Sequence, residues 1–516
     1  MLTEVQKAFV APFVTSIDSN VYALVNVPPQ VAAAVIARLS RSQLGVRELL
    51  ATEFTNDLPN PPPVRTIQAD AESFHDRVLG KYGDDSVADM AGVHIIFEDI
   101  SAFAAKAIQE RRLAGYIEKS TRYVPMYKVD GNYPYHIPVE LAAAEYSALA
   151  YIQMMNKLFD RYHEVQEGLI KWYMKHVPRD EGTTERAWMR SIEAQALDGA
   201  RGLLPLSLNT TMGMFANART YEYLIYNLEA EGIAEFTDIA NKLHEATRAV
   251  VPAMIRRVGT LRGDNAVRRL ATMKASRKAA PPLRYQAEIS SVHLVRHSED
   301  GMNDILSDIW FENSRRGHDQ EPYITLDHSQ SDVDELLETQ AGKRESRFDR
   351  LGRAFEAAAY TFEIVSSIGA WRDLQRHRMT SQSRQQFKAS LGYETPDIIR
   401  KSGMETLWQD AAGNAGTFAD FIGGHLNNTD LTAYALPLCY RVRWRISMNL
   451  RELCHLVELR TQPQGHAEYR MIAWQMFDIV NEIQPELAKY IQFVVTDEVL
   501  LARLTAEEKA ERRLGI

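Results

Sequence analysis

The sequence predicts two diverged α/β modules in tandem, each rich in helices, because three pairs of segments recur in the same order. Leu204-Pro205 precedes Asn217-Ala218-Arg219 by the same separation that places Leu436-Pro437 before Asn449-Leu450-Arg451. Each asparagine then leads into a helical pattern, TYEYLIYNLEAE in the first half and ELCHLVELR in the second. Upstream, VADMAGVHIIFEDIS is similar to FEAAAYTFEIVSSIG. Three ordered matches favour a duplication over chance.

Length and composition set the class of protein. The chain has 516 residues, enough for two to four domains, and its net charge of −9 argues against a general nucleic-acid binder. Its two cysteines are too few for a disulfide framework. The N-terminal sequence lacks a signal-peptide pattern, and no apolar run approaches the length of a membrane span. We therefore expect a cytoplasmic protein without membrane contact.

The predicted domains are a first repeat over residues 1–255, a basic linker over 256–284 and a second repeat over 285–516. The linker is crowded with arginine and lysine and closes on Pro281-Pro282. We interpret it as a solvated linker or surface helix, with nucleic-acid contact as the alternative. The apolar pattern of Ser291–Val295 predicts the strand that opens the second repeat.

Hydrophobic periodicity predicts the other elements. Apolar residues recur at helical spacing from Ala148 to Phe159, and again from Ile472 to Ile483 before Pro485. Alternation over Leu206–Leu208 and over Tyr440–Ile446 predicts strands. Helices dominate by length.

Two clusters in the second half carry candidate chemistry. Arg376-His377-Arg378 follows an apolar run, and three such groups at a helix end suit an anion or the polar edge of a flavin. The alternative is a charged helix terminus that caps its own carbonyls. Asn449, Arg451, His455 and Arg460 share a predicted helix, on which Arg451 and His455 lie on one face. That face is either a polar site or simply solvated.

The first half offers anion-binding candidates of a different kind. Glu118, Ser120 and Arg122 alternate, as in an extended segment or loop, and Arg122 suits a phosphate. Arg201 is a second candidate, although either arginine could be purely structural. The sequence has no zinc-type spacing, no phosphate loop and no nucleophile elbow, so we expect no metal site.

On these motifs both halves resemble the flavin-dependent thymidylate synthases, over about residues 20–255 and 285–495. That family has one loop of the form R-H-R-x-x-S-x-x-E-x-S-x-R-Y. Here Arg376-His377-Arg378 with Ser381 resembles its start, whereas Glu118-Lys119-Ser120-Thr121-Arg122-Tyr123 resembles its end. The resemblance implies an α/β (α+β) fold in which each repeat is helix-rich with a mixed or antiparallel sheet.

The resemblance also implies ligands and roles. The family binds FAD, methylenetetrahydrofolate, NADPH and dUMP, uses no cysteine nucleophile, and builds each site from several subunits of a homotetramer. Matching positions imply catalytic roles for Arg460 and Ser120. The implied cofactor-binding residues are Arg376, His377, Arg378, Glu356, Asn449, Arg451, His455, Ser40, Ser86, Asn217 and Arg219. The implied substrate-binding residues are Glu118, Ser120, Arg122, Arg201, Asp373 and Arg460.

Departures from the family pattern are complementary. The first half has Glu110-Arg111-Arg112 in place of R-H-R, and Leu228 in place of the pyrimidine arginine. The second half has lost the E-x-S-x-R segment and carries Asp373 where the family usually has Gln or Glu. We therefore expect a homodimer that forms a pseudo-tetramer, with one nucleotide-side half and one flavin-side half in each site. The alternatives are a relative acting at C5 of another pyrimidine nucleotide, and a non-catalytic flavin- or nucleotide-binding homologue.

Overall fold

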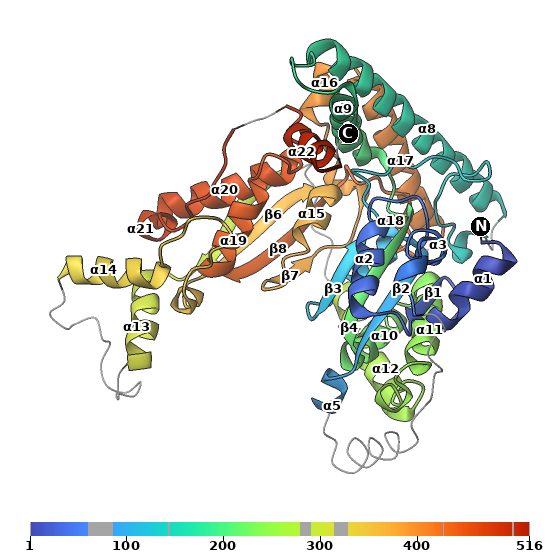
Figure 1. Ribbon diagram of the computed structural model, residues 1–516, viewed down its shortest axis with the longest axis horizontal. Helices are drawn as coiled ribbons and strands as arrows, with labels where there is room; N and C mark the ends of the chain where they lie inside the picture. The colour runs from blue at the N-terminus through green and yellow to red at the C-terminus, as the bar shows by residue number, and fades with distance from the viewer. Residues whose placement is uncertain are drawn as a thin grey trace. The chain divides into compact units, whose positions relative to one another are not determined.

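The computed structural model describes residues 2–59, 86–142, 145–278, 290–313, 329–426, 428–497 and 500–514 (Figure 1). Contacts divide the chain into two compact units. The first comprises residues 1–166, 203–285 and 407–437, and the second comprises 167–202, 286–406 and 438–516. Each unit therefore contains one segment from the opposite half of the sequence. The repeat boundaries drawn from the sequence stay a prediction, and the end of the linker, 279–284, lies outside the described residues.

The first unit is built on a four-stranded antiparallel sheet with the order β1-β2-β4-β3. Its strands are β1 (Val21–Leu24), β2 (Gly92–Ser101), β3 (Ala114–Glu118) and β4 (Asn209–Asn217). Its helices are α1 (Glu4–Val10), α2 (Pro29–Leu39), α3 (Val46–Thr52), α5 (Ser86–Asp89), α6 (Ala102–Ile108), α7 (Val139–Ala142), α10 (Ala218–Glu229), α11 (Ala234–Arg248), α12 (Leu261–Lys278) and α18 (Thr432–Ala435), with 3-10 turns η1 (Ala11–Phe13), η2 (Thr55–Asp57) and η5 (Pro252–Met254). Two long helices, α8 (Glu145–His176) and α17 (Glu405–His425), belong mostly to this unit.

The second unit repeats that sheet with the order β5-β6-β8-β7, again antiparallel. Its strands are β5 (Ser291–His297), β6 (Ala359–Ser367), β7 (Ser381–Arg384) and β8 (Arg441–Asn449). Its helices are α9 (Glu185–Ala200), α13 (Gly301–Asn313), α14 (Gln330–Ala341), α15 (Ile368–Leu374), α16 (Asp397–Lys401), α19 (Leu450–Arg460), α20 (Ala467–Ile483), α21 (Pro485–Ala488) and α22 (Leu504–Leu514), with 3-10 turns η4 (Arg201–Leu203), η7 (Arg353–Glu356) and η8 (Ala389–Leu391). Figure 1 shows α15, α19 and α20 gathered around β6 and β8.

Each unit has its own buried serine–glutamate contact, and in both it lies at the end of the second strand of the sheet. Ser101 caps α6, and both its backbone N–H and its hydroxyl donate to Glu235, each at 2.7 Å. Ser367 caps α15 in the same way and donates both groups to Glu468. A carboxylate that accepts from a helix N-terminus satisfies otherwise unpaired donors. This repeated contact supports the duplication independently of sequence identity.

The helix that follows the last strand of each unit, β4 or β8, begins at a matched asparagine. The Asn217 side chain accepts from the N–H of Thr220, and that of Asn449 accepts from the N–H of Glu452, each at 2.9 Å. Asparagine is a favoured N-cap because its short side chain reaches the free N–H groups of the first turn. Aligning the two caps, Asn217 with Asn449, therefore aligns α10 with α19 residue by residue.

Several predicted elements are confirmed. β5 contains the predicted strand Ser291–Val295, α8 contains the predicted helix, and α20 ends at Ile483 immediately before Pro485. The alternation predicted around Tyr440–Ile446 is found in β8, where Trp444 and Ile446 are buried. The basic segment contains the helix α12, as the surface-helix interpretation expects.

One predicted strand is misplaced. Residues 206–208 lie in a turn, and β4 begins only at Asn209. Leu206 and Leu208 are nevertheless buried, because their backbone groups bond to the segment that follows β2. Ser207 between them is buried too, so the apolar-polar alternation of the sequence does not reflect alternating burial here. Across the described ranges, no helix is long and apolar enough to cross a bilayer.

Candidate functional site

A cavity of about 470 Å³ opens in the second unit between α19, η7 and the turn after α15. Its volume is within the range of small-molecule sites. Eight of the nine residues singled out in the second half line it: Glu356, Arg376, His377, Arg378, Asn449, Arg451, His455 and Arg460. These residues come from three separate segments, and Glu356 and Arg460 are 104 positions apart, so the fold gathers what the sequence separates. Asp373, the ninth, does not line the cavity.

The cavity is strongly cationic. Five arginines line it against two glutamates: four were singled out from the sequence, Arg376, Arg378, Arg451 and Arg460, and Arg350 was not. Arg376 and Arg378 are exposed, at the end of the short helix α15. Guanidinium groups form paired charge-assisted hydrogen bonds with phosphate and carboxylate. The lining therefore suits an anionic ligand.

Some of these groups are already held by protein partners. Arg451 donates from Nε to the Leu351 carbonyl at 2.7 Å and pairs with Glu356 at 3.1 Å. Arg451 and Glu356 are thus fixed on one wall of the cavity. Asn449 uses its side-chain oxygen for the cap of α19. These three residues shape the cavity even before a ligand is considered.

His377 belongs to this charged cluster and is buried. Its Nδ1 is 2.9 Å from the Glu452 carboxylate, and Arg460 donates from Nε to its Nε2, also at 2.9 Å. Burial, with the positive charges of Arg460 and Arg350, holds the pKa of His377 well below its ordinary value. His377 is therefore neutral near pH 7. Burial also raises the pKa of Glu452 and lowers that of Arg460.

His377, Glu452 and His455 have potential ligand atoms within 4.8 Å of one another, and in the described part of the chain they are the one cluster of this kind. A cation bound there would face five arginines on the same walls. Both ring nitrogens of His377 already have partners. Burial, together with the positive charges of Arg350 and Arg460, lowers the pKa of His455 to about 4 despite the opposing effect of Glu452. The charge around the cluster favours an anion over a metal.

Arg201, predicted from the first half, lies in the second unit. Its guanidinium donates to the Asp373 carboxylate at 2.8 Å, and Arg201 is buried whereas Asp373 is half-buried. The negative charge of Asp373 also acts on Arg460, and the positive charge of Arg201 acts on Glu468. The structure therefore brings two predicted substrate residues into direct contact within one unit.

The remaining first-half candidates lie in the first unit, around the end of β3. Glu118 is buried and paired with Lys106 at 2.7 Å, and Gln109 donates to the same carboxylate oxygen. Ser120 donates its N–H to the carbonyl of Ser40 at 3.1 Å, and its hydroxyl accepts from the N–H of Arg122. Ser40, Ser120 and Arg122 are thus neighbours, as a shared site requires. Their ligand roles stay predictions.

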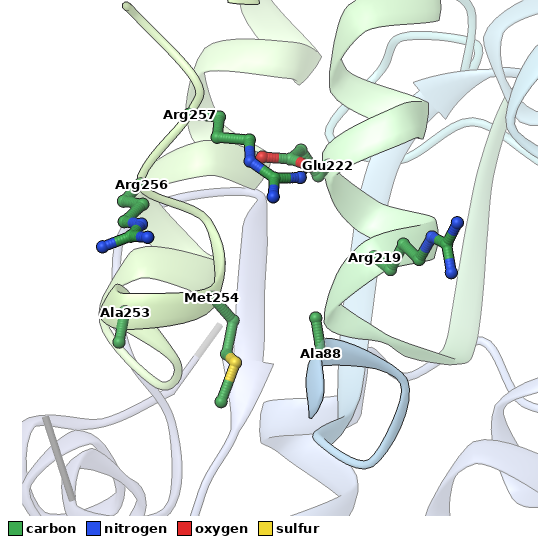
Figure 2. A pocket seen from close by; sticks show the side chains of 7 residues that line it. All are labelled: Ala88, Arg219, Glu222, Ala253, Met254, Arg256 and Arg257. Atoms are coloured by element: carbon green, nitrogen blue, oxygen red, sulfur yellow. Dashed lines mark ion pairs between the residues drawn. The ribbon is translucent and has the colours of Figure 1, made fainter. Parts of the chain in front are cut away.

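A much smaller pocket lies in the first unit beside α10 (Figure 2). It measures about 10 Å³, the space of roughly one water molecule. Figure 2 shows the Arg257 guanidinium against Glu222, and the two form an ion pair at 3.5 Å. Arg219, on the other side of α10, pairs with Asp89 at 3.2 Å, and Asn217 donates to the same carboxylate at 3.1 Å. For Ser86, which begins α5, only the backbone is described.

A family model described as thymidylate synthase complementing protein matches residues 23–253 and 311–486. The chain belongs to this family. The two matched segments fall one in each half, in agreement with a tandem duplication of the thymidylate synthase complementing fold. The resemblance to flavin-dependent thymidylate synthases stated from the motifs is confirmed at the level of the family.

Relatives of known sequence and a solved structure match the chain over different lengths. A UPF0159 protein of Chlamydia muridarum is 31% identical over 98% of this chain and 97% of its own length. The flavin-dependent thymidylate synthase of Sulfolobus acidocaldarius is 28% identical over 39% of this chain and 75% of its own. The solved thymidylate synthase X of Helicobacter pylori with FAD and dUMP gives a TM-score of 0.30 at 20% identity, covering 39% and 99% of the two chains.

Four residues that line the cavity were missed by the sequence patterns, and two of them, Glu452 and Arg350, are charged. Glu452 is three positions before His455 on the same helix, and an E-x-x-H spacing places both side chains on one face. That spacing was a readable signal. Arg350 lies in an irregular segment before η7, where no periodicity assigns a direction to its side chain. Only the fold of this family member brings Arg350 to the cavity.

Proposed function

We propose that the cavity of the second unit is a flavin site, and that the protein reductively methylates dUMP at C5 with methylenetetrahydrofolate and NADPH. One observation carries the proposal: eight residues carried over from the family's motifs surround one cavity of ligand size. Membership of the thymidylate synthase complementing family gives this coincidence its chemical meaning.

The cationic lining fits FAD, whose pyrophosphate carries negative charge. In this proposal Arg376 and Arg378 hold the phosphates, while Glu356, Asn449 and Arg451 form the opposite wall. Reduced flavin supplies the hydride that turns the transferred one-carbon unit into a methyl group. The chain's own part is to bind and orient both ligands and to direct the Arg460 guanidinium at the uracil.

The nucleotide side of the site is proposed to come from Glu118, Ser120, Arg122 and Arg201. Ser120 and Arg122 lie in one loop beside Ser40, and Arg122 is only half-buried. A homodimer would then act as a pseudo-tetramer in which a first-half loop completes a second-half cavity. Cys439 and Cys454 are buried, and burial raises the pKa of both thiols, so neither is suited to act as a nucleophile.

The ultraviolet-visible spectrum of the purified protein tests the flavin, and its change on adding dUMP tests the nucleotide. Release of tritium from 5-tritiated dUMP, dependent on both methylenetetrahydrofolate and NADPH, tests the reaction. Arg122→Ala and Arg378→Ala should each abolish that release. Mixing the two variants should restore part of it if sites are shared between chains. Undiminished activity in both variants would contradict the proposal.

A second candidate is C5 modification of another pyrimidine nucleotide. It is favoured by Asp373, which stands where the family usually has the longer Gln or Glu and whose negative charge acts on Arg460. Tritium release from 5-tritiated UMP and dUMP, measured side by side, separates the two candidates. A non-catalytic homologue would bind flavin and release tritium from neither nucleotide.

A further inference from the structure

Three side chains in the second unit form a chain of hydrogen bonds that ends at the cavity. Arg460 donates from Nε to His377 Nε2, and His377 Nδ1 contacts the Glu452 carboxylate, both at 2.9 Å. An arginine nitrogen can only donate, so Nε2 of His377 carries the lone pair. The proton of the neutral imidazole is therefore on Nδ1, where it is donated to Glu452.

His377 and Glu452 are shielded from water, and Arg460 is half-buried. The side chains of His377 and Glu452 are exposed by only 3% and 8%, and Arg460 is packed near the Tyr469 ring, 5.4 Å from its centre. In such surroundings a hydrogen bond is stronger than at the surface, and an unsatisfied group is costly. The tautomer of His377 is thus set by its neighbours rather than by solvent.

The same arrangement does not occur in the first half. The matched caps Asn217 and Asn449 make Thr220 the counterpart of Glu452 and Leu228 the counterpart of Arg460. The matched serines of the two buried contacts make Arg111 the counterpart of His377. All three members are replaced together. A set that is present or absent as a whole is consistent with one shared role.

We propose that Glu452 is a positioning residue: it fixes His377 with its proton on Nδ1, and His377 in turn fixes the Arg460 guanidinium for the nucleotide. Glu452 need not touch either ligand to do this. The inference rests on the proposed function for the identity of the ligand, whereas the hydrogen-bond chain stands on geometry alone. It adds to the site an acidic residue that the family's motifs did not supply.

Two substitutions separate the roles of shape and hydrogen bonding. In Glu452→Gln the amide oxygen can still accept from Nδ1–H, so we expect dUMP affinity within about threefold of wild type. In Glu452→Leu the acceptor is lost, and we expect dUMP to bind at least about tenfold more weakly while FAD affinity changes by less than about threefold. Thr220→Ala, at the matching helix position of the first half, is the control and should leave both affinities unchanged.

Nitrogen NMR of protein labelled at histidine reads the tautomer directly, with the His377 signal assigned from a His377→Gln variant. We expect Nδ1–H in wild type and in Glu452→Gln, and a shift toward Nε2–H or a mixture in Glu452→Leu. Nε2–H in wild type overturns the inference even if Glu452→Leu does not fold. So does a Glu452→Leu protein with unchanged tautomer and dUMP affinity. Wild-type protein that binds neither FAD nor dUMP would instead remove the proposed function, and the tautomer would still decide the hydrogen-bond chain.

Discussion

Arg201 and Asp373 form an ion pair at 2.8 Å although 172 positions separate them in the sequence. The arginine is almost fully buried, with 6% of its side chain exposed, and the carboxylate is the acceptor that faces it. A buried charge that loses its partner is costly, because desolvation is no longer offset. The ion pair therefore stabilises the second unit through Arg201, a residue for which the family resemblance also implies a substrate role.

Replacing Asp373 with Ala should destabilise the protein. We expect the free energy of unfolding to fall by about 1–3 kcal/mol, less than for a fully buried pair because Asp373 is partly exposed. Urea denaturation measures this change. Asp373→Gln keeps an oxygen acceptor and should cost less than Asp373→Ala. Equal free energies of unfolding for wild type, Asp373→Ala and Asp373→Gln would show that the ion pair does not stabilise the protein.

One flavin should bind to each chain, not two. The second-half cavity measures about 470 Å³ and is lined by His377 and Arg460, whereas the matching first-half positions are Arg111 and Leu228. The ratio of flavin absorbance to polypeptide concentration, measured after saturation and removal of free ligand, gives the stoichiometry. A ratio of two would mean that the first half also binds flavin.

The cationic lining should recognise the phosphates of FAD rather than its ring. Arg378→Ala is expected to weaken FAD binding by at least about tenfold, since one charge-assisted hydrogen bond contributes about 1.5–3 kcal/mol. Riboflavin, which has no phosphate, should lose little affinity. Lys343→Ala is a suitable control, because Lys343 is highly exposed and does not line the cavity. Equal losses for FAD and riboflavin would place Arg378 at the ring instead.

Stability should depend on pH through His455. Its ordinary pKa is 6.5, and burial with nearby positive charges lowers it to about 4 in the folded protein. Between these values the unfolded chain binds more protons, so this contribution is complete above pH 6.5 and is lost as the pH falls toward 4. We expect wild type to lose about 1–2 kcal/mol more than His455→Asn over this window, after allowance for partial exposure. Melting temperatures at a series of pH values measure the difference, and parallel curves would exclude His455 as its source.

Local pattern was enough to predict much of the fold. The alternation of β8 and the stop of α20 before Pro485 follow from side-chain period and from the missing proline N–H. The tandem organisation followed from matched segments whose caps the structure shows to be equivalent. Such features depend on neighbours along the chain, which a sequence displays directly.

Contacts between distant segments were the part that could not be predicted. Glu118 was assigned a nucleotide role, yet its carboxylate faces Lys106 from α6 in a buried pair that no spacing rule reveals. Arg350 reaches the cavity from an irregular segment, where side-chain direction has no period. The division of the chain is similar: residues 407–437 pack in the first unit although they lie in the second half. Tertiary packing decides each of these.

The paired serine–glutamate contacts also order events in the history of the gene. Ser101 with Glu235 and Ser367 with Glu468 make the same contact in both units, although the two halves differ at every member of the Glu452, His377 and Arg460 chain. A contact that both repeats have in the same place was present in their single-repeat ancestor. The serine–glutamate contact is therefore older than the duplication, and the divergence of the ligand-facing residues came after it.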